Sequence, residues 1–238
     1  MTTAGAKTFV LVHGAWHGGW CWRGVADNLR GRGHTVFAPT QTGLGERAHL
    51  ISKTITLDTF IEDIVNVIGF ERLQDAILVG HSFAGSTISG VADRMPERIR
   101  RLVYLDALTI ENGQTPMSAL PKDVVEARMK QAESSGGVSI PAPPASAFGI
   151  ADPAQARSAE NRFTPHPLST YTSPLKLVHP VGNGLPMTYI VCGDPVYAPL
   201  QTSRDWAKAH GMTMTSIAAG HSAMLIAPDA LADMLDGF

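Results

Sequence analysis

The stretch AILVGHSFAG, residues 76–85, decides the fold that we expect for this chain. Its first half is a short, continuous apolar run, which is typical of a strand buried on both faces of a sheet. A tight turn around Ser82 follows, and a segment with helical spacing begins directly after it. Strand, tight turn and helix in this order form the context in which a serine hydroxyl is lifted above a sheet edge as a nucleophile.

The turn departs from the G-x-S-x-G pattern at one position, where Ala84 stands in place of the last glycine and Gly85 comes one residue later. Alanine is the next smallest residue, so the helix can still approach the strand closely. The alternative is a plain strand–helix turn in which Ser82 caps the helix. Because the flanking strand and helix patterns both match, we predict that Ser82 is the nucleophile.

Similar apolar runs recur along the chain, separated by segments with helical periodicity. The runs occupy Thr8–Val12 and residues 34–38, 76–80, 101–105, 188–192 and 214–218. One helix pattern follows Thr56, a plausible N-cap, and the last one covers residues 228–238. Such alternation predicts an α/β fold, a mostly parallel sheet with helices on both faces.

Residues 108–184 interrupt this rhythm, because they contain no strand run. They include one charged, helical piece, Lys122–Ala132, and a patch rich in Ser, Gly and Pro at residues 134–149. We expect too little apolar content in this patch for a core element. We therefore predict a core of residues 1–107 and 185–238, with residues 108–184 inserted as a cap or lid.

The partners of Ser82 are sought at the ends of the other strands. His221 stands between the last strand run and the last helix and is C-terminal to the serine, as a general base should be. A hydrolase also needs two backbone N–H groups that face the developing oxyanion. We expect these from Phe83, directly after the serine, and from Ala15 in the glycine-rich loop after the first strand.

The carboxylate that orients the base has two candidates. Asp106 ends the strand run 101–105, and Asp194 follows the run 188–192. Asp106 is slightly favoured, because a carboxylate at the end of a buried apolar strand is costly unless it is paired. Asp194 stays open, although an aspartate before a proline is also a common turn residue.

Large apolar side chains near these motifs indicate a pocket for the substrate. Trp16, Phe83, Tyr197 and Met224 are the candidates, and an ordinary core position is the alternative for each. We expect neither a metal nor an organic cofactor.

Composition limits the class of protein and its partners. Among 238 residues, 44% are hydrophobic and 17% charged, and the net charge is -2 without any basic block. We therefore expect a soluble enzyme that binds a small molecule and neither nucleic acid nor a membrane, and a homodimer stays open. With a short N-terminal apolar run and only Cys21 and Cys192, a cytoplasmic location is expected.

Five motifs together resemble one group of α/β-hydrolases, which contains plant methyl esterases, plant hydroxynitrile lyases and bacterial esterases of similar size. The motifs are VHGAWHGGWCW (12–22), GHSFAG (80–85), LVYLDAL (102–108), YIVC (189–192) and GHSAMLIAP (220–228). The resemblance implies the α/β-hydrolase fold. In the plant members the triad acid stands three residues after the cysteine, where this chain has Pro195, so Asp194 comes one residue early.

The resemblance also separates two activities. The hydroxynitrile lyases of this group use a threonine in the first loop and a lysine after the histidine, where this chain has Gly14 and Ser222. The sequence therefore favours hydrolysis of a carboxylic or carbamate-type ester through an acyl-enzyme on Ser82. Lyase-like chemistry with the same Ser–His pair, or a non-catalytic small-molecule receptor on the same fold, are the alternatives.

Overall fold

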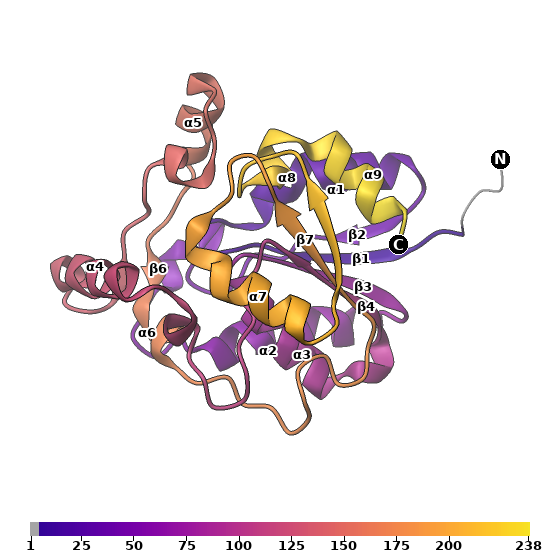
Figure 1. Ribbon diagram of the computed structural model, residues 1–238, viewed down its shortest axis with the longest axis horizontal. Helices are drawn as coiled ribbons and strands as arrows, with labels where there is room; N and C mark the ends of the chain where they lie inside the picture. Colours follow the sequence, from indigo (N-terminus) through magenta and orange to yellow (C-terminus); the bar gives the residue numbers. More distant parts are fainter. Residues whose placement is uncertain (1–4) are drawn as a thin grey trace.

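The core of the molecule is a single parallel sheet of six strands in the order β2-β1-β3-β4-β7-β8 (Figure 1). A computed structural model describes residues 5–238. The strands are β1 (Thr8–Val12), β2 (Thr35–Phe37), β3 (Ala76–His81), β4 (Ile99–Leu105), β7 (Met187–Cys192) and β8 (Thr213–Ile217).

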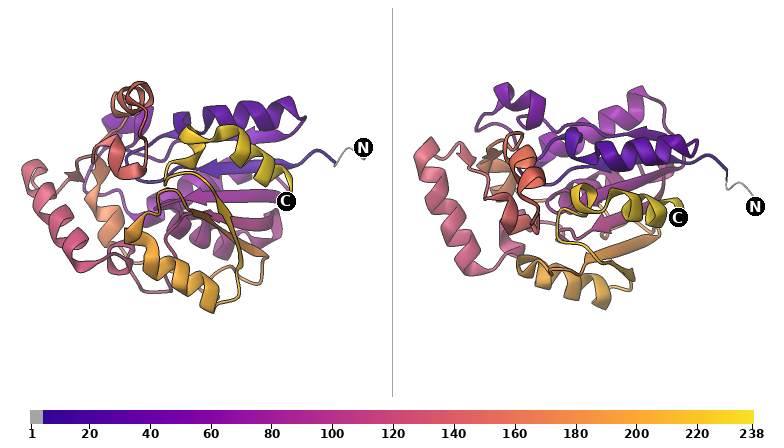
Figure 2. Two further views of the ribbon diagram at one scale, coloured as in Figure 1. Left: turned by 45° about the horizontal axis from the view of Figure 1, so that its top comes forward. Right: turned by 90° about the horizontal axis from the view of Figure 1, so that it is seen from above.

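Helices cover both faces of this sheet (Figures 1 and 2). One face carries α1 (Arg23–Gly31), α8 (Ala223–Ile226) and α9 (Pro228–Asp236), and the other carries α2 (Leu57–Phe70), α3 (Ala84–Arg94) and α7 (Gln201–Ala209). Strand β1 shows why the runs are continuous. Phe9 and Leu11 join the core under α1 and α9, whereas Val10 and Val12 join the core under α2 and α3.

The predicted fold class is confirmed, since each expected strand is present within two residues of its expected bounds. The largest difference is at β4, which begins at Ile99 rather than at residue 101. Helix α2 begins directly after Thr56, whose N–H donates to Thr59 Oγ1 at 3.1 Å. Within residues 5–238, every helix is too short or too polar to cross a bilayer.

The segment between β4 and β7 lies over the end of the sheet at which the strands finish (Figure 2). It contains α4 (Lys122–Ala132), α5 (Pro153–Glu160), α6 (Leu168–Thr172), and the two-residue strands β5 (Ser139–Ile140) and β6 (His166–Pro167), which pair antiparallel. Helix α4 has the expected bounds. The expectation that this segment contains no strand is wrong, because a two-residue pairing leaves no periodic pattern in a sequence.

The patch at residues 134–149 also corrects a prediction. Ile140, Ala145 and Phe148 are buried, so the patch packs against the rest of the molecule despite its low apolar content. The Gly, Pro and Ser residues shape its turns, and the few apolar residues carry the packing. The average composition of the patch therefore does not reveal that a few of its residues are buried.

Helix α3 approaches the end of β4 so closely that only glycine fits at residue 85. A Cβ atom there would lie 2.1 Å from the carbonyl oxygen of Leu108. The same contact region joins the backbones directly, since the N–H of Leu108 donates to the carbonyl of Ser82 at 2.8 Å. The glycine of the sequence motif therefore brings the serine turn against the strand that ends in Asp106.

We predict that Gly85→Ala destabilises the protein by about 1–3 kcal/mol, because the helix must move away from Leu108. Gly69→Ala is the matched control, since Gly69 also lies in a helix but would place its Cβ in open space. That change is expected to stabilise the protein by about 0.5–1 kcal/mol. Urea unfolding of both variants checks this, and equal stabilities would contradict the close approach.

Candidate active site

Ser82 occupies the turn between β3 and α3 in the left-handed backbone region, with φ of 54°. This conformation costs an ordinary residue about 1–2 kcal/mol, so it persists only when its surroundings hold it in place. Backbone hydrogen bonds do so: the N–H of Ser82 donates to Leu105 O at 3.1 Å, and its carbonyl accepts from Leu108. The Ser82 side chain is thereby directed over the end of the sheet, where it is partly exposed.

His221 joins Ser82 to Asp106 in one chain of hydrogen bonds. Its Nε2 lies 2.9 Å from Ser82 Oγ, and its Nδ1 lies 2.7 Å from Asp106 Oδ2. The carboxylate can only accept, so Nδ1 carries the proton and Nε2 is free to accept the serine proton. This arrangement supports serine as nucleophile, histidine as base and aspartate as the group that orients the base.

Asp106 is fully buried, and both of its oxygens are engaged. Oδ1 lies 3.3 Å from Nη1 of Arg204, and Oδ2 accepts from His221. Arg204 on α7 is itself buried and also donates to the carbonyl of Tyr197 at 3.1 Å. This ion pair offsets the cost of burying the Asp106 carboxylate, as expected for a carboxylate at the end of a buried strand.

Asp194 is placed differently. It lies in an exposed turn after β7, and its carboxylate makes no hydrogen bond or ion pair with residues 5–238. Its backbone N–H donates to Ala219 O at 3.1 Å, so its interactions are those of a turn residue. The geometry brings Asp106, and not Asp194, to the histidine.

The two expected oxyanion donors are both buried beside Ser82. Neither the N–H of Ala15 nor that of Phe83 donates to another residue in the described part of the chain. The loop of Ala15 is fixed in place through His13, whose Nε2 accepts from the N–H of Gln41 at 3.0 Å. Two unengaged amides next to a nucleophile are what a developing oxyanion requires.

Aromatic rings surround the triad. Tyr197 stacks on His221 with centroids 4.1 Å apart. Phe148 also stacks on His221, at 6.1 Å, and its ring is tilted against that of Trp16 at 5.7 Å. Phe83 lies deeper, 4.7 Å from Tyr171. Trp16 and Tyr197 therefore lie close to the catalytic histidine or to the ring of Phe148 that adjoins it, and their role in a substrate pocket stays a prediction.

Met224 corrects the remaining pocket prediction. It is buried on α8 in the core under α1 and α9, together with Trp22 and Leu231. The side chain therefore belongs to the core between the sheet and the helices α1 and α9. The alternative of an ordinary core position therefore holds for Met224.

The inserted segment is bonded to both catalytic loops. The N–H of Ser222 donates to Phe148 O at 3.1 Å, and Trp16 Nε1 donates to Ile140 O at 3.1 Å. A Cβ on Gly220 would lie only 2.9 Å from Gly149 Cα, so the two backbones are in contact. No periodicity in the sequence signals such contacts.

Two arginines near the triad were not identified from the sequence. Arg204 holds Asp106, and Arg128 on α4 lies over the rings of Trp16 and Tyr171 at 5.2 and 4.7 Å. Both stand in helices with many charged residues, where a buried arginine looks like a solvated one. Only the packing of these helices distinguishes them.

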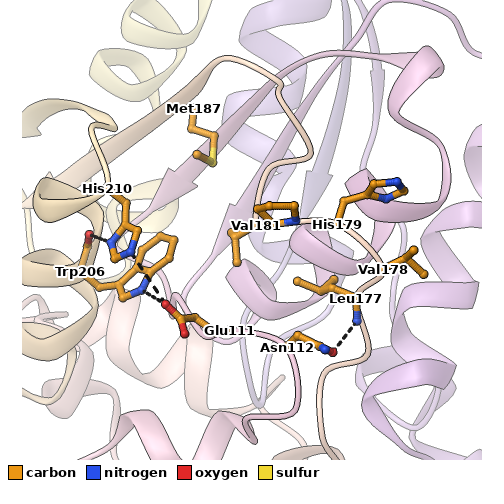
Figure 3. Close-up of a pocket in the computed structure, with 10 residues that line it drawn as sticks. Glu111, Asn112, Leu177, Val178, His179, Val181, Met187, Trp206 and His210 are labelled. Atoms are coloured by element: carbon orange, nitrogen blue, oxygen red, sulfur yellow. Dashed lines mark hydrogen bonds and ion pairs between the residues drawn. The ribbon is translucent and has the colours of Figure 1, made fainter.

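One surface pocket lies away from the triad. It measures about 610 Å³ and is lined by the segment after β4, the segment before β7 and the end of α7 (Figure 3). Trp206 and His210 stack there with centroids 3.8 Å apart, and Glu111 accepts from Trp206 Nε1 at 3.0 Å. It contains none of the site residues expected from the sequence.

Comparisons of the sequence and of the structure with known proteins all find α/β-hydrolases or esterases. A model described as the alpha/beta hydrolase family matches residues 9–234. The chain is 40% identical to the carbendazim hydrolyzing esterase of Nocardioides sp. (strain SG-4G), over 95% of this chain and 97% of that protein. It is 32% identical to methylesterase 1 of Arabidopsis thaliana, over 48% of this chain and 44% of that one. An extracellular alpha/beta-hydrolase from a Paenibacillus species has a similar structure, with a TM-score of 0.83 and 26% identity over 96% of this chain and 97% of that one.

We predict that Asp106→Asn lowers kcat/KM for an ester by about 10³- to 10⁴-fold, because the amide no longer holds the required tautomer of His221. Asp194→Asn is the matched control, and its kcat/KM should stay within about twofold of wild type, as is usual for a surface change. Steady-state kinetics on a p-nitrophenyl ester measure both. A larger loss in the Asp194 variant would reverse the assignment of the acid.

We also predict that the free energy of unfolding falls steadily as the pH drops below 6.5. Burial lowers the pKa of His13 to about 4 and that of His17 to about 3, and it keeps the pKa values of His81 and His166 well below 6.5. Between pH 6.5 and about 4, the unfolded chain therefore binds protons that the folded chain does not. Each histidine lowers stability by up to about 1.4 kcal/mol per pH unit. Urea unfolding at pH 7.5, 6 and 5 measures the slope, and a stability independent of pH would contradict these buried, neutral histidines.

Proposed function

Because the chain belongs to the alpha/beta hydrolase family, we propose that it hydrolyses small carboxylic esters through an acyl-enzyme formed on Ser82. The resemblance inferred from the five sequence motifs is confirmed, and so is the α/β-hydrolase fold. The observation that carries the proposal is the chain of hydrogen bonds from Ser82 through His221 to Asp106.

In the first half of the reaction, His221 Nε2 takes the proton of Ser82 as Oγ attacks the ester carbonyl. The amides of Ala15 and Phe83 bind the negative charge that develops on the carbonyl oxygen. The buried carboxylate of Asp106 stabilises the protonated imidazole. His221 then gives its proton to the departing alcohol, which leaves Ser82 acylated.

In the second half, water replaces the alcohol and the same groups act again. His221 takes a proton from the water, which attacks the acyl carbonyl, and the oxyanion again binds to the two amides. Return of the proton to Ser82 Oγ releases the carboxylic acid. The chemistry of each half needs only side chains and backbone groups of this chain.

Carbamate-type esters are included in the proposed substrate class. The support is the 40% identity to an esterase named for hydrolysing carbendazim, a carbamate, with nearly complete coverage of both chains. The same triad acts on a carbamate carbonyl as on a carboxylic ester. We further propose that residues 108–184 act as the cap over this site, since Phe148 and Ile140 contact both catalytic loops.

Steric contacts argue against lyase activity of the kind expected from the hydroxynitrile lyases. A Cβ on residue 14 would lie 2.8 Å from Ser82 Cβ and 2.9 Å from His81 Nδ1. A threonine therefore does not fit at Gly14 without displacing the nucleophile. The position after His221 carries the buried Ser222 rather than a cation.

We propose a cytoplasmic location, supported by two buried cysteines that form no disulfide. A small-molecule ester is the proposed partner, and neither nucleic acid nor a membrane is proposed. A homodimer is the assembly to be tested by measuring the mass of the protein in solution.

We predict that Ser82→Ala lowers kcat on p-nitrophenyl esters by about 10³- to 10⁶-fold, because the nucleophile is lost. Ser134→Ala, at an exposed serine of the inserted segment, is the matched control and should leave kcat unchanged. A fluorophosphonate probe should label the wild type at Ser82. Unchanged turnover in the Ser82 variant would refute the mechanism, and absence of both labelling and turnover would favour a receptor.

A further inference from the structure

Arg128 is a buried cation without a counter-ion among residues 5–238. Only 7% of its surface is exposed, and its Nη1 atom has no hydrogen-bond partner. It forms no ion pair with any carboxylate in residues 5–238, and the one buried carboxylate there, Asp106, is already held by Arg204 and His221. Burying an unpaired charge is strongly unfavourable, so this position destabilises the unliganded protein.

Among the described residues, uncharged aromatic side chains lie next to Arg128. They are the ring of Trp16, the phenols of Tyr171 and Tyr197, and the imidazole of His166. Burial raises the pKa of Tyr171 to about 12, and burial together with the Arg128 cation keeps the pKa of His166 well below its usual value. Near neutral pH, none of these neighbours supplies a negative charge.

Arg128 lies close to the two expected oxyanion donors through the rings of Trp16 and Tyr171. Its guanidinium is 5.2 Å from the ring of Trp16, the residue next to the expected oxyanion donor Ala15. It is 4.7 Å from the ring of Tyr171, which in turn lies 4.7 Å from Phe83, the second donor. The rings of Trp16 and Tyr171 thus connect Arg128 to both residues that are expected to bind the oxyanion.

We propose that Arg128 binds a carboxylate on the acyl part of the substrate, so that the preferred substrates are monoesters of dicarboxylic acids. This inference rests on the proposed ester hydrolysis and names the class of ester. A guanidinium offers a planar pair of N–H donors that matches a carboxylate, and the aromatic rings fix its plane. Water is added across the ester bond, which gives the dicarboxylate and the free alcohol.

The test measures binding in the Ser82→Ala background, in which the ester is not consumed. Isothermal titration calorimetry compares monomethyl succinate, glutarate and adipate with the corresponding neutral amides, such as methyl 4-carbamoylbutanoate. The best of the three acids should bind about 10- to 100-fold more tightly than its amide. The length of that acid reports the distance from the ester carbonyl to Arg128.

Three variants identify the source of this preference. Arg128→Met should abolish it, and Arg128→Lys, which keeps the charge without the planar fork, should reduce it. Lys130→Met removes a positive charge from the exposed side of the same helix and should leave the preference unchanged. If Arg128→Met does not fold, the comparison of Arg128→Lys with Lys130→Met decides the question.

Equal binding of acid and amide, or a preference that survives in both Arg128 variants, would overturn the inference and show that the arginine only supports the aromatic rings. Turnover by the wild type separates this result from failure of the proposed function. Hydrolysis of neutral esters without any preference for acids refutes only the role of Arg128. Arg128-dependent binding without any hydrolysis refutes the esterase and keeps the carboxylate site.

Discussion

The site depends on two backbone hydrogen bonds that tie the turn at Ser82 to the end of β4. The N–H of Ser82 donates to Leu105, and the carbonyl of Ser82 accepts from Leu108. These bonds hold Ser82 in a left-handed conformation that an isolated serine would avoid. They also fix Asp106, which lies between the two bonded residues, beside the turn. A single histidine can therefore bridge from the serine to the carboxylate.

Two buried arginines near the site, Arg204 and Arg128, differ in how their charge is balanced. Arg204 pairs with Asp106, so the most buried carboxylate of the site is compensated within the protein. In the part of the chain that the structure describes, Arg128 has no such partner, although it is as deeply buried as Arg204. One arginine thus completes the machinery, and the other leaves a charge for the substrate to balance. The distinction lies in what each guanidinium faces, and residue type alone does not reveal it.

The sequence was sufficient for the fold and for the order of the main groups, because both follow from local rules. Continuous apolar runs such as Thr8–Val12 mark buried parallel strands, and the positions of Ser82 and His221 follow from the ends of such strands. The choice between Asp106 and Asp194 stayed open, since it depends on the pairing of Asp106 with Arg204 on α7, 98 positions later in the chain. Met224 was misplaced because the facing of a four-residue helix cannot be read from its sequence.

The contact between Gly149 and Gly220 makes the inserted segment and the histidine loop one mechanical unit. The Ser222 amide adds a hydrogen bond to Phe148 across the same junction. Replacing the inserted segment with one from another protein would therefore alter the loop that positions His221 as well as the residues around the triad. Changes in substrate range and changes in catalytic activity are therefore coupled, and recombination among relatives should preserve Gly149 and Gly220 as a pair.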